Sequence, residues 1–593
     1  MSVFLPVTVD EVKKLGWNSI DVVFFTGDAY IDHPSFGTAI IARLLESLGL
    51  RVAIVPQPNW QDDLRDFKKF GKPNLFFAVS AGNMDSMVNH YTANKFLRHD
   101  DAYTPGNRYG ARPDYAVTVY CNILKKLYPD TPIVIGGIEA SLRRLAHYDY
   151  WSNTIKPSIL VESKADLLLY GMAEKAVKEL VLQLKQKKQF SKIIVNQSAI
   201  LTDTLPNEEY ILLPSYEECK ENLLSFAKAY RIIEENANKY FPDVIVQPHG
   251  DKYVVVKPPY HTTQSELDEI YSLPYTYLPH PKYNKKPPIP AFEMIKNSIT
   301  IHRGCFGGCS FCSLAIHQGK FIVSRSIDSI LAEIEKLKTL PYFKGHIRDL
   351  GGPSANMYGM IPINTNKCKK CKRPSCIYPN ICSNLNTDPT KLLELYRKIS
   401  SLSYVKKLTI GSGIRYDIHI RLMKNNQKHK EYLTQVIRHH VSGRLKVAPE
   451  HIHDDVLKLM FKPSFKYFEE FYELFNYINN KYNLKQQLVP YFISNHPGCT
   501  IYHMKQLSEK LKQLNIKPEQ VQDFTPTPMT LASIMYACEL NPYTLKKIYV
   551  AKDLKERILQ KEMFFWYKNS NKKQINKKLL LLHKKKNDVK KLK

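Results

Sequence analysis

The chain has 593 residues, of which 44% are hydrophobic and 24% are charged, so it is a globular protein of two or three domains and not a disordered one. Its net charge of +29 would suit a nucleic-acid partner, but the lysines are widely spread and form no stripe interleaved with aromatic residues. No apolar stretch is long enough to cross a bilayer, and the first ten residues have no signal-peptide pattern. We therefore expect a cytoplasmic protein with no membrane partner, and we interpret the charge as a compositional bias.

Short apolar strands alternate with helices over residues 1–235. Strands are predicted at 21–27, 52–55, 74–79, 132–137 and 165–171, and helices at 36–50, 115–127, 139–145 and 173–184. This alternation predicts βαβ units and a doubly wound α/β domain. Ligands of such sheets bind at the carboxyl ends of the strands. The polar residues expected there are Asp28, Asp32, His33, Ser80, Asn83 and Glu139.

Two segments interrupt this pattern. Residues 90–112 are polar and rich in glycine, arginine and tyrosine, which predicts a long loop that serves as a lid. Residues 236–290 begin with a hairpin at 244–256 and continue into a proline-rich run that stiffens the chain. We assign 236–290 to the linker between two domains.

Six further strands are predicted over residues 291–545, at 298–302, 346–353, 405–410, 444–448, 487–493 and 520–524. Helices are predicted between them at 326–340, 454–461 and 500–514. Six β/α repeats indicate a partial barrel, whose loops at the carboxyl ends of the strands carry the chemistry.

The first of these strands leads into three closely spaced cysteines, Cys305, Cys309 and Cys312, in a C-x3-C-x2-C pattern. Thiolates this close bind one soft metal centre. Three protein ligands leave one iron of a four-iron cube open, whereas a structural zinc usually recruits a fourth protein ligand. The glycines of the loop, at 304, 307 and 308, allow a tight curl that brings N–H groups near the cluster sulfurs. A zinc knuckle or three unrelated thiols are the alternatives.

With Phe311 before the last cysteine, this motif resembles that of the radical S-adenosylmethionine (SAM) superfamily. The resemblance implies a [4Fe-4S] cluster on the three cysteines, SAM on the fourth iron, and an α/β fold in which a radical SAM partial (β/α)6 barrel follows the N-terminal domain. It also implies SAM contacts from Gly351 and Gly352 through their backbone, from Ser412 and Arg415 to the carboxylate or ribose, and from Glu450 to a ribose hydroxyl. For Gly351 and Gly352 the alternative is that the glycine pair only shapes a turn.

The order of motifs also resembles the YgiQ-type radical SAM proteins over about residues 1–550. It runs from the cysteine loop through Asp-Leu-Gly-Gly-Pro-Ser-Ala-Asn-Met-Tyr and Ala-Pro-Glu-His to Pro-Tyr-Phe-Ile-Ser-Asn-His-Pro-Gly. The N-terminal domain is similar to the cobalamin-binding domains that precede many radical SAM cores. However, Asp32 and His33 are adjacent, unlike the spaced pair of the D-x-H-x-x-G motif, and this argues against cobalamin held through histidine. The alternative is a scaffold whose loops cap the barrel.

A second cysteine group lies in an insertion at 353–390 and consists of Cys368, Cys371, Cys376 and Cys382. Four thiolates in one short segment predict a second metal site, either zinc or an auxiliary iron–sulfur cluster, with free thiols as the alternative. Residues 546–593 are assigned to a lysine-rich C-terminal extension, whose tail from about Lys561 is expected to be mobile and could bind RNA only weakly and unspecifically.

These observations predict an enzyme that reductively cleaves SAM and uses the resulting 5′-deoxyadenosyl radical on an unknown substrate. A small electron donor such as flavodoxin or ferredoxin is the expected partner. The alternative is a metal-stabilised RNA-binding protein without catalysis, in which both cysteine groups hold metal.

Overall fold

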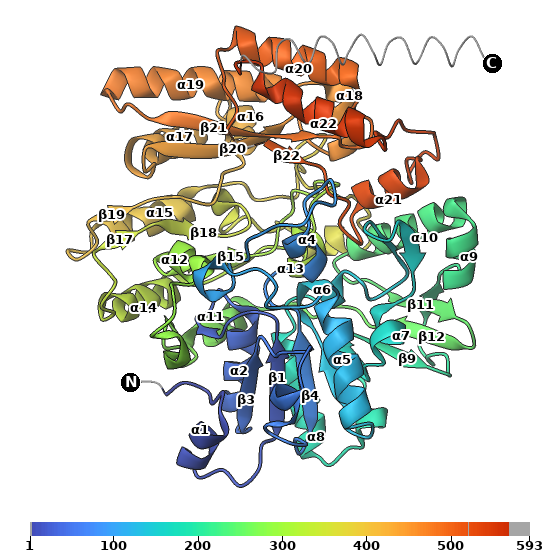
Figure 1. The fold of residues 1–593 in the computed structure, drawn as a ribbon. Helices are drawn as coiled ribbons and strands as arrows, with labels where there is room; N and C mark the ends of the chain where they lie inside the picture. The colour runs from blue at the N-terminus through green and yellow to red at the C-terminus, as the bar shows by residue number, and fades with distance from the viewer. Residues whose placement is uncertain (1–2, 520, 569–593) are drawn as a thin grey trace.

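The computed structural model describes residues 3–519 and 521–568 and shows an N-terminal α/β domain below a partial barrel (Figure 1). A sheet in the order β10-β11-β12-β9-β8-β5-β4-β1-β3 organises the N-terminal domain. Its strands are β1 Val22–Thr26, β3 Val52–Pro56, β4 Phe76–Ser80, β5 Ile133–Ile135, β8 Leu167–Leu169, β9 Ser198–Thr202, β10 Tyr210–Leu212, β11 Val244–His249 and β12 Lys252–Val256. The run from β8 to β3 is parallel, so the five predicted strands form the parallel half of the sheet.

Helices cover both faces of this parallel half, as the prediction of a doubly wound domain requires. Val22 and Phe24 of β1 belong to one buried cluster, whereas Val23 and Phe25 belong to another on the opposite face. The covering helices are α2 Gly37–Ser47 and α8 Glu174–Lys185 on the first face and α5 Ala116–Leu127 and α7 Ile159–Ser163 on the second. Burial on both faces explains why the strands are continuous apolar runs in the sequence.

The hairpin predicted at the start of the linker forms, but it is part of the N-terminal sheet. β12 pairs antiparallel with both β11 and β9. Val254 and Val255 of β12 are buried, so this strand is a component of the core. The connection between the domains therefore lies after the hairpin, where α11 Gln264–Ser272 interrupts the proline-rich run.

All six predicted barrel strands are present. They are β14 Ser298–Thr300, the interrupted pair β17 His346–Ile347 and β18 Asp349–Gly351, β19 Lys407–Leu408, β20 Arg444–Glu450, β21 Gln487–Ser494 and β22 Val521–Asp523. The pairings β14–β18, β17–β19, β20–β21 and β21–β22 are all parallel. Their carboxyl ends therefore point the same way, so the loops that leave them share one mouth.

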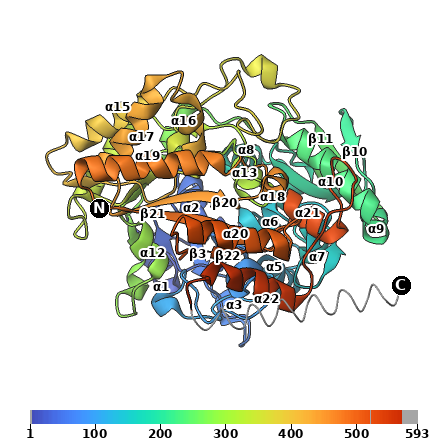
Figure 2. The same cartoon turned by 90° about the horizontal axis from the view of Figure 1, so that it is seen from above.

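The barrel helices include the three that the sequence predicts, α14 Ile327–Lys338, α18 Asp454–Met460 and α20 Ile501–Gln513. Four more are present: α15 Thr390–Ser400, α16 Tyr416–Leu422, α17 Gln427–His439 and α19 Lys466–Tyr482. α19 and α20 lie side by side over the outer face of the sheet formed by β20, β21 and β22 (Figures 1 and 2). Apolar residues of α19 at positions 468, 471, 475 and 478 recur at helical spacing and are buried.

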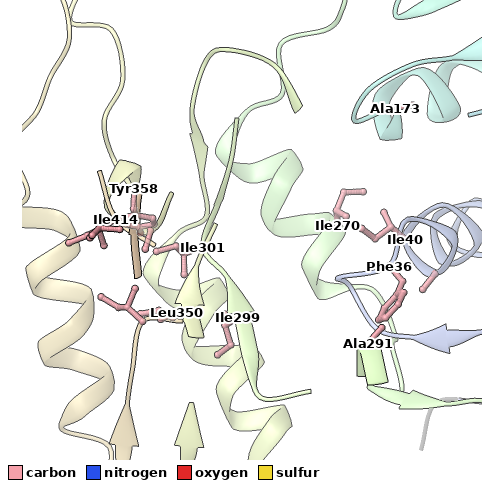
Figure 3. Close-up of a cluster of buried hydrophobic side chains, with 14 of the residues drawn as sticks. Phe36, Ile40, Ala173, Ile270, Ala291, Ile299, Ile301, Leu350, Tyr358 and Ile414 are labelled. Carbon is pink, nitrogen blue, oxygen red and sulfur yellow. The ribbon is translucent and has the colours of Figure 1, made fainter. Parts of the chain in front are cut away.

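One buried cluster runs through both domains. Figure 3 shows two parts of it, Ile299, Leu350 and Ile414 in the barrel and Phe36 and Ile40 of α2 in the N-terminal domain. A shared core of this kind predicts that the two domains keep a defined arrangement.

The first part of the predicted C-terminal extension is packed against the rest of the molecule. Helix α22 (Leu554–Glu562) buries Leu559, and Arg557 donates hydrogen bonds to the carbonyls of Ala93 at 2.7 Å and Phe524 at 3.2 Å. The lysine-rich remainder, 569–593, lies outside the described residues. No helix within the described part of the chain combines the length and apolar character needed to span a membrane.

Candidate active site

The cysteine loop leaves β14 at the barrel mouth, where the sequence predicts it. A Cβ built on Gly307 would lie 3.3 Å from Cys305 Sγ and 3.9 Å from Cys309 Sγ, so two of the sulfurs converge on this glycine. Gly308 has a φ of 60°, and a Cβ there would overlap the carbonyl oxygen of Pro374. Glycine is therefore required at 308 both for the turn and for close approach of the insertion.

The thiols of this loop are partly exposed but surrounded by protein. Burial raises the pKa of Cys305 and Cys312, and the neighbouring Cys309 raises it further. Without metal these two thiols are therefore neutral near pH 7. A bound iron–sulfur cluster would supply the positive charge that keeps them as thiolates, so binding would release protons.

Arg415 connects the loop to the exit of β19. Its guanidinium donates two 2.8 Å hydrogen bonds to the Asp417 carboxylate, and its Nη1 lies 3.8 Å from Cys309 Sγ. Asn356 holds the Arg415 backbone at both ends, accepting from its N–H at 2.8 Å and donating to its carbonyl at 3.0 Å. The predicted contact of Arg415 with SAM stays a prediction, whereas its place beside a cluster sulfur is a feature of the fold.

Gly351 and Gly352 lie at the exit of β18, next to β14. Asp349, just before them, accepts hydrogen bonds from Gly411 N at 2.8 Å and from Ser412 N and Oγ at 3.0 Å each. It thereby ties the exits of β18 and β19 together. A Cβ on Gly352 would come within 2.5 Å of the His302 ring, so close packing already requires this glycine.

Glu450 ends β20 with a left-handed backbone, at a φ of 66°, beside a shift in the pairing register with β21. Strained residues and bulges of this kind occur at functional sites. Its carboxylate lies 3.6 Å from Lys462 Nζ, and burial raises its pKa although Lys462 opposes the shift. Its charge also raises the pKa of Cys312, which places it near the cysteine loop.

The residues present fit a four-iron cluster. The donors are three soft thiols on one glycine loop, and a guanidinium is directed at one of the sulfurs. Within the described residues no three His, Cys, Asp or Glu side chains are arranged to hold a metal ion. A four-iron cube spaces its cysteine sulfurs more widely than a zinc ion, whose Zn–S distance is about 2.3 Å, so a preformed zinc-like geometry is not required.

The second cysteine group packs directly on the first loop. Cys376 N donates to Phe306 O at 3.0 Å, and Cys382 N donates to Cys376 O at 2.8 Å. The Cys368 sulfur accepts from the Asn384 side chain at 3.3 Å. Burial raises the pKa of Cys376 to about 11, with the other three cysteines contributing. The four thiols are thus neighbours, and the metal that they would hold stays a prediction.

Cobalamin does not fit the carboxyl edge of the N-terminal sheet. Arg112, from the predicted lid segment, is fully buried there and pairs with Asp28 at 2.9 Å and Asp101 at 3.0 Å. Asp32 is paired with Arg43, and His33 is 1% exposed with its ring edge-on to Tyr277. Asp32 and His33 are therefore both engaged by the chain itself, which argues against cobalamin held through His33.

Three of the residues that shape this mouth are absent from the sequence-based assignment: Asp349, Asn356 and Asp417. Asp349 precedes the glycine pair by two residues, so its position at a strand exit was a usable signal. Asp417 pairs with Arg415 two residues earlier, so this contact is local, whereas Asn356 acts on Arg415 from another loop and no spacing within the sequence indicates that.

The chain is similar to known proteins over nearly its whole length. A family model described as Radical SAM N-terminal matches residues 4–298, and a domain of unknown function (DUF3362) matches residues 519–588. A UPF0313 protein of Bacteroides thetaiotaomicron is 53% identical over 591 residues, covering 96% of this chain and 95% of that protein. A UPF0313 protein of Porphyromonas gingivalis is 51% identical over 585 residues, covering 97% and 92%.

Two solved structures show more distant similarity. The radical SAM methyltransferase TsrM from Kitasatospora setae is 12% identical, with a TM-score of 0.45 over 86% of this chain and 75% of that chain. The cobalamin-dependent SAM radical enzyme OxsB is 10% identical, with a TM-score of 0.48 over 88% and 55%.

Proposed function

The chain belongs to the UPF0313 family and is a radical SAM enzyme, and we propose that it reductively cleaves SAM at a [4Fe-4S] cluster held by Cys305, Cys309 and Cys312. The observation that carries this proposal is the convergence of the first two thiols around Gly307 at the exit of the first barrel strand. When bound and reduced, such a cluster gives one electron to SAM, which splits into methionine and a 5′-deoxyadenosyl radical that takes a hydrogen atom from the substrate.

The chain's own residues would then bind and orient SAM. The backbone of Gly351 and Gly352, at the neighbouring strand exit, would receive the amino group. Ser412, held by Asp349, and the Glu450 carboxylate stand at the next exits for the carboxylate and the ribose. The barrel and the N-terminal domain would exclude water around the radical. The substrate stays unknown.

The test is anaerobic reconstitution with iron and sulfide, followed by SAM and dithionite under argon. We expect slow release of 5′-deoxyadenosine, measured by mass spectrometry, without any added substrate. The C305A/C309A/C312A variant should lose the product, together with the part of the broad visible thiolate–iron absorption that a cluster on this loop contributes.

The matched control is C121A/C219A/C538A, which removes three cysteines that are buried elsewhere. It should keep both the absorption and the product. Full loading and reduction with no 5′-deoxyadenosine over hours would contradict the proposal. Stoichiometric zinc without iron would instead favour the RNA-binding alternative.

A further inference from the structure

The insertion that carries the second cysteine group is strongly and uniformly basic. Residues 350–387 contain five basic residues and no Asp or Glu. Lys372 pairs with Glu235 at 3.0 Å, and Arg373 donates to the carbonyl of Tyr378. Lys367, Lys369 and Lys370 are exposed and have no ion pair among the described residues. Three uncompensated positive charges therefore lie within four residues.

Exposed apolar side chains surround these lysines. Ile363 is 69% exposed and Phe241 is 53% exposed, both far above what a core side chain shows. The ammonium of Lys369 lies 5.9 Å from the centre of the Phe241 ring. Ile363 N donates to Asn384 O at 2.8 Å, and the Asn384 side chain contacts Cys368, so both apolar residues lie around this cysteine.

We call this surface the lysine face and define it by Phe241, Ile361, Ile363, Lys367, Lys369 and Lys370. An apolar centre with a charged margin is typical of a protein interface. Single-stranded RNA is bound by several exposed aromatic rings on which successive bases stack, whereas the lysine face has one such ring, Phe241, and the neighbouring Tyr240 is already stacked on His261 at 3.9 Å. The composition favours a protein partner with an acidic surface.

A short path of bonded groups connects the lysine face to the first cysteine loop. Cys368 belongs to the face's own segment, and Cys376 N–H bonds the carbonyl of Phe306, the residue after Cys305. Cys305, Cys376 and Cys382 pack against the same buried cluster around Phe306. Figure 2 shows this insertion, in yellow, at the margin of the molecule between α16 and β11.

We propose that the lysine face docks an acidic one-electron donor protein, whose electron would reduce a cluster held by the first cysteine loop. This rests on the proposed function, because SAM cleavage consumes one electron per turnover. The donor is oxidised by one electron, the cluster is reduced by one, and the electron leaves the cluster when the C–S bond of SAM breaks. The positive face would steer the donor and set its orientation.

The probe is a bacterial flavodoxin, a small acidic flavin protein, and the enzyme is the reconstituted full chain. We expect K367E/K369E/K370E to weaken flavodoxin binding by about tenfold or more in calorimetric titration, since like charges then face each other. Release of 5′-deoxyadenosine driven by reduced flavodoxin should fall with it. Release driven by dithionite should not change, because that small reductant needs no docking.

The matched control is K187E/K188E/K192E, three exposed lysines at and after the end of α8. It should bind flavodoxin as the wild type does. Equal binding to the lysine-face variant, or an equal loss in the control, would overturn the proposal. So would an RNA oligonucleotide that displaces flavodoxin from the face with higher affinity. If dithionite itself yields no product, the proposed function fails, and the binding result still decides the docking face.

Discussion

Arg415 lies between the first cysteine loop and the loop that follows β19. Two nitrogens of its guanidinium donate hydrogen bonds to the Asp417 carboxylate, and the third points to the sulfur of Cys309. The reduction potential of an iron–sulfur cluster depends on net charge and on hydrogen bonds to its sulfurs. A fixed positive charge at this place would therefore favour the reduced, more negative cluster.

We predict that R415M keeps its iron but shifts the cluster potential downward, on the order of 60 mV, which is a tenfold change in a one-electron equilibrium. The measurement is a redox titration followed by electron paramagnetic resonance. R415M leaves the Asp417 carboxylate buried and unpaired, and the double variant R415M/D417N removes that charge as well. A similar shift in the double variant would therefore show that the shift comes from the loss of the Arg415 charge. R348M, at an exposed arginine, is the control. An unchanged potential in a fully loaded R415M would contradict this role.

At the scale of elements, the insertion after β18 is held by its backbone as well as by any metal. Cys376 and Cys382 take part in main-chain hydrogen bonds, and Ile377 and Leu385 are buried. Its fold therefore does not depend on the four sulfurs alone.

We predict that the quadruple variant C368S/C371S/C376S/C382S lowers the metal content per chain but still releases 5′-deoxyadenosine with dithionite. Elemental analysis of iron and zinc checks the first part and mass spectrometry the second. A metal count equal to that of the wild type would show that these thiols hold no metal.

The strands were predictable because parallel strands buried on both faces leave continuous apolar runs, as in β1 and β3. Helix α19 was also readable from its buried phenylalanines, although the sequence-based assignment does not include it. The position of the hairpin β11–β12 in the sheet could not be predicted. Its partner β9 lies about forty residues earlier, and side-chain alternation along a strand does not indicate which other strand it pairs with.

At the scale of the whole molecule, a buried charge network closes the edge of the N-terminal sheet. Arg112 is shared by Asp28 and Asp101, and it also donates to the carbonyl of Ala81 at 2.8 Å. Burial raises the pKa of Asp28 to about 6, although Arg112 lowers it. The network depends on the lid segment folding back onto the strands.

We predict that R112M lowers stability at pH 7.5 by about 3 kcal/mol, because it leaves buried carboxylates unpaired. Without Arg112 the folded-state pKa of Asp28 rises further above its unfolded value of 3.8. Asp28 then binds a proton as the pH falls through the raised folded-state pKa, so the loss should be smaller at pH 5.5.

Urea unfolding followed by circular dichroism measures this difference. R51M, which breaks a partly exposed pair with Asp21, should cost about 1 kcal/mol or less, as is usual for ion pairs at the surface. A loss in R112M that is independent of pH would contradict the assignment to Asp28.

The sequence by itself determined the chemistry of the ligands. The x3-x2 spacing of the cysteines, the glycines between them and the apolar strand before them are local, and local geometry follows from neighbouring residues. Only the tertiary structure decided what packs against that loop, namely Arg415 at Cys309 and Cys376 at Phe306. It also decided that Arg112 fills the edge of the N-terminal sheet. Residue patterns report which face of an element is buried, but the partner that buries it is selected by packing of the whole chain.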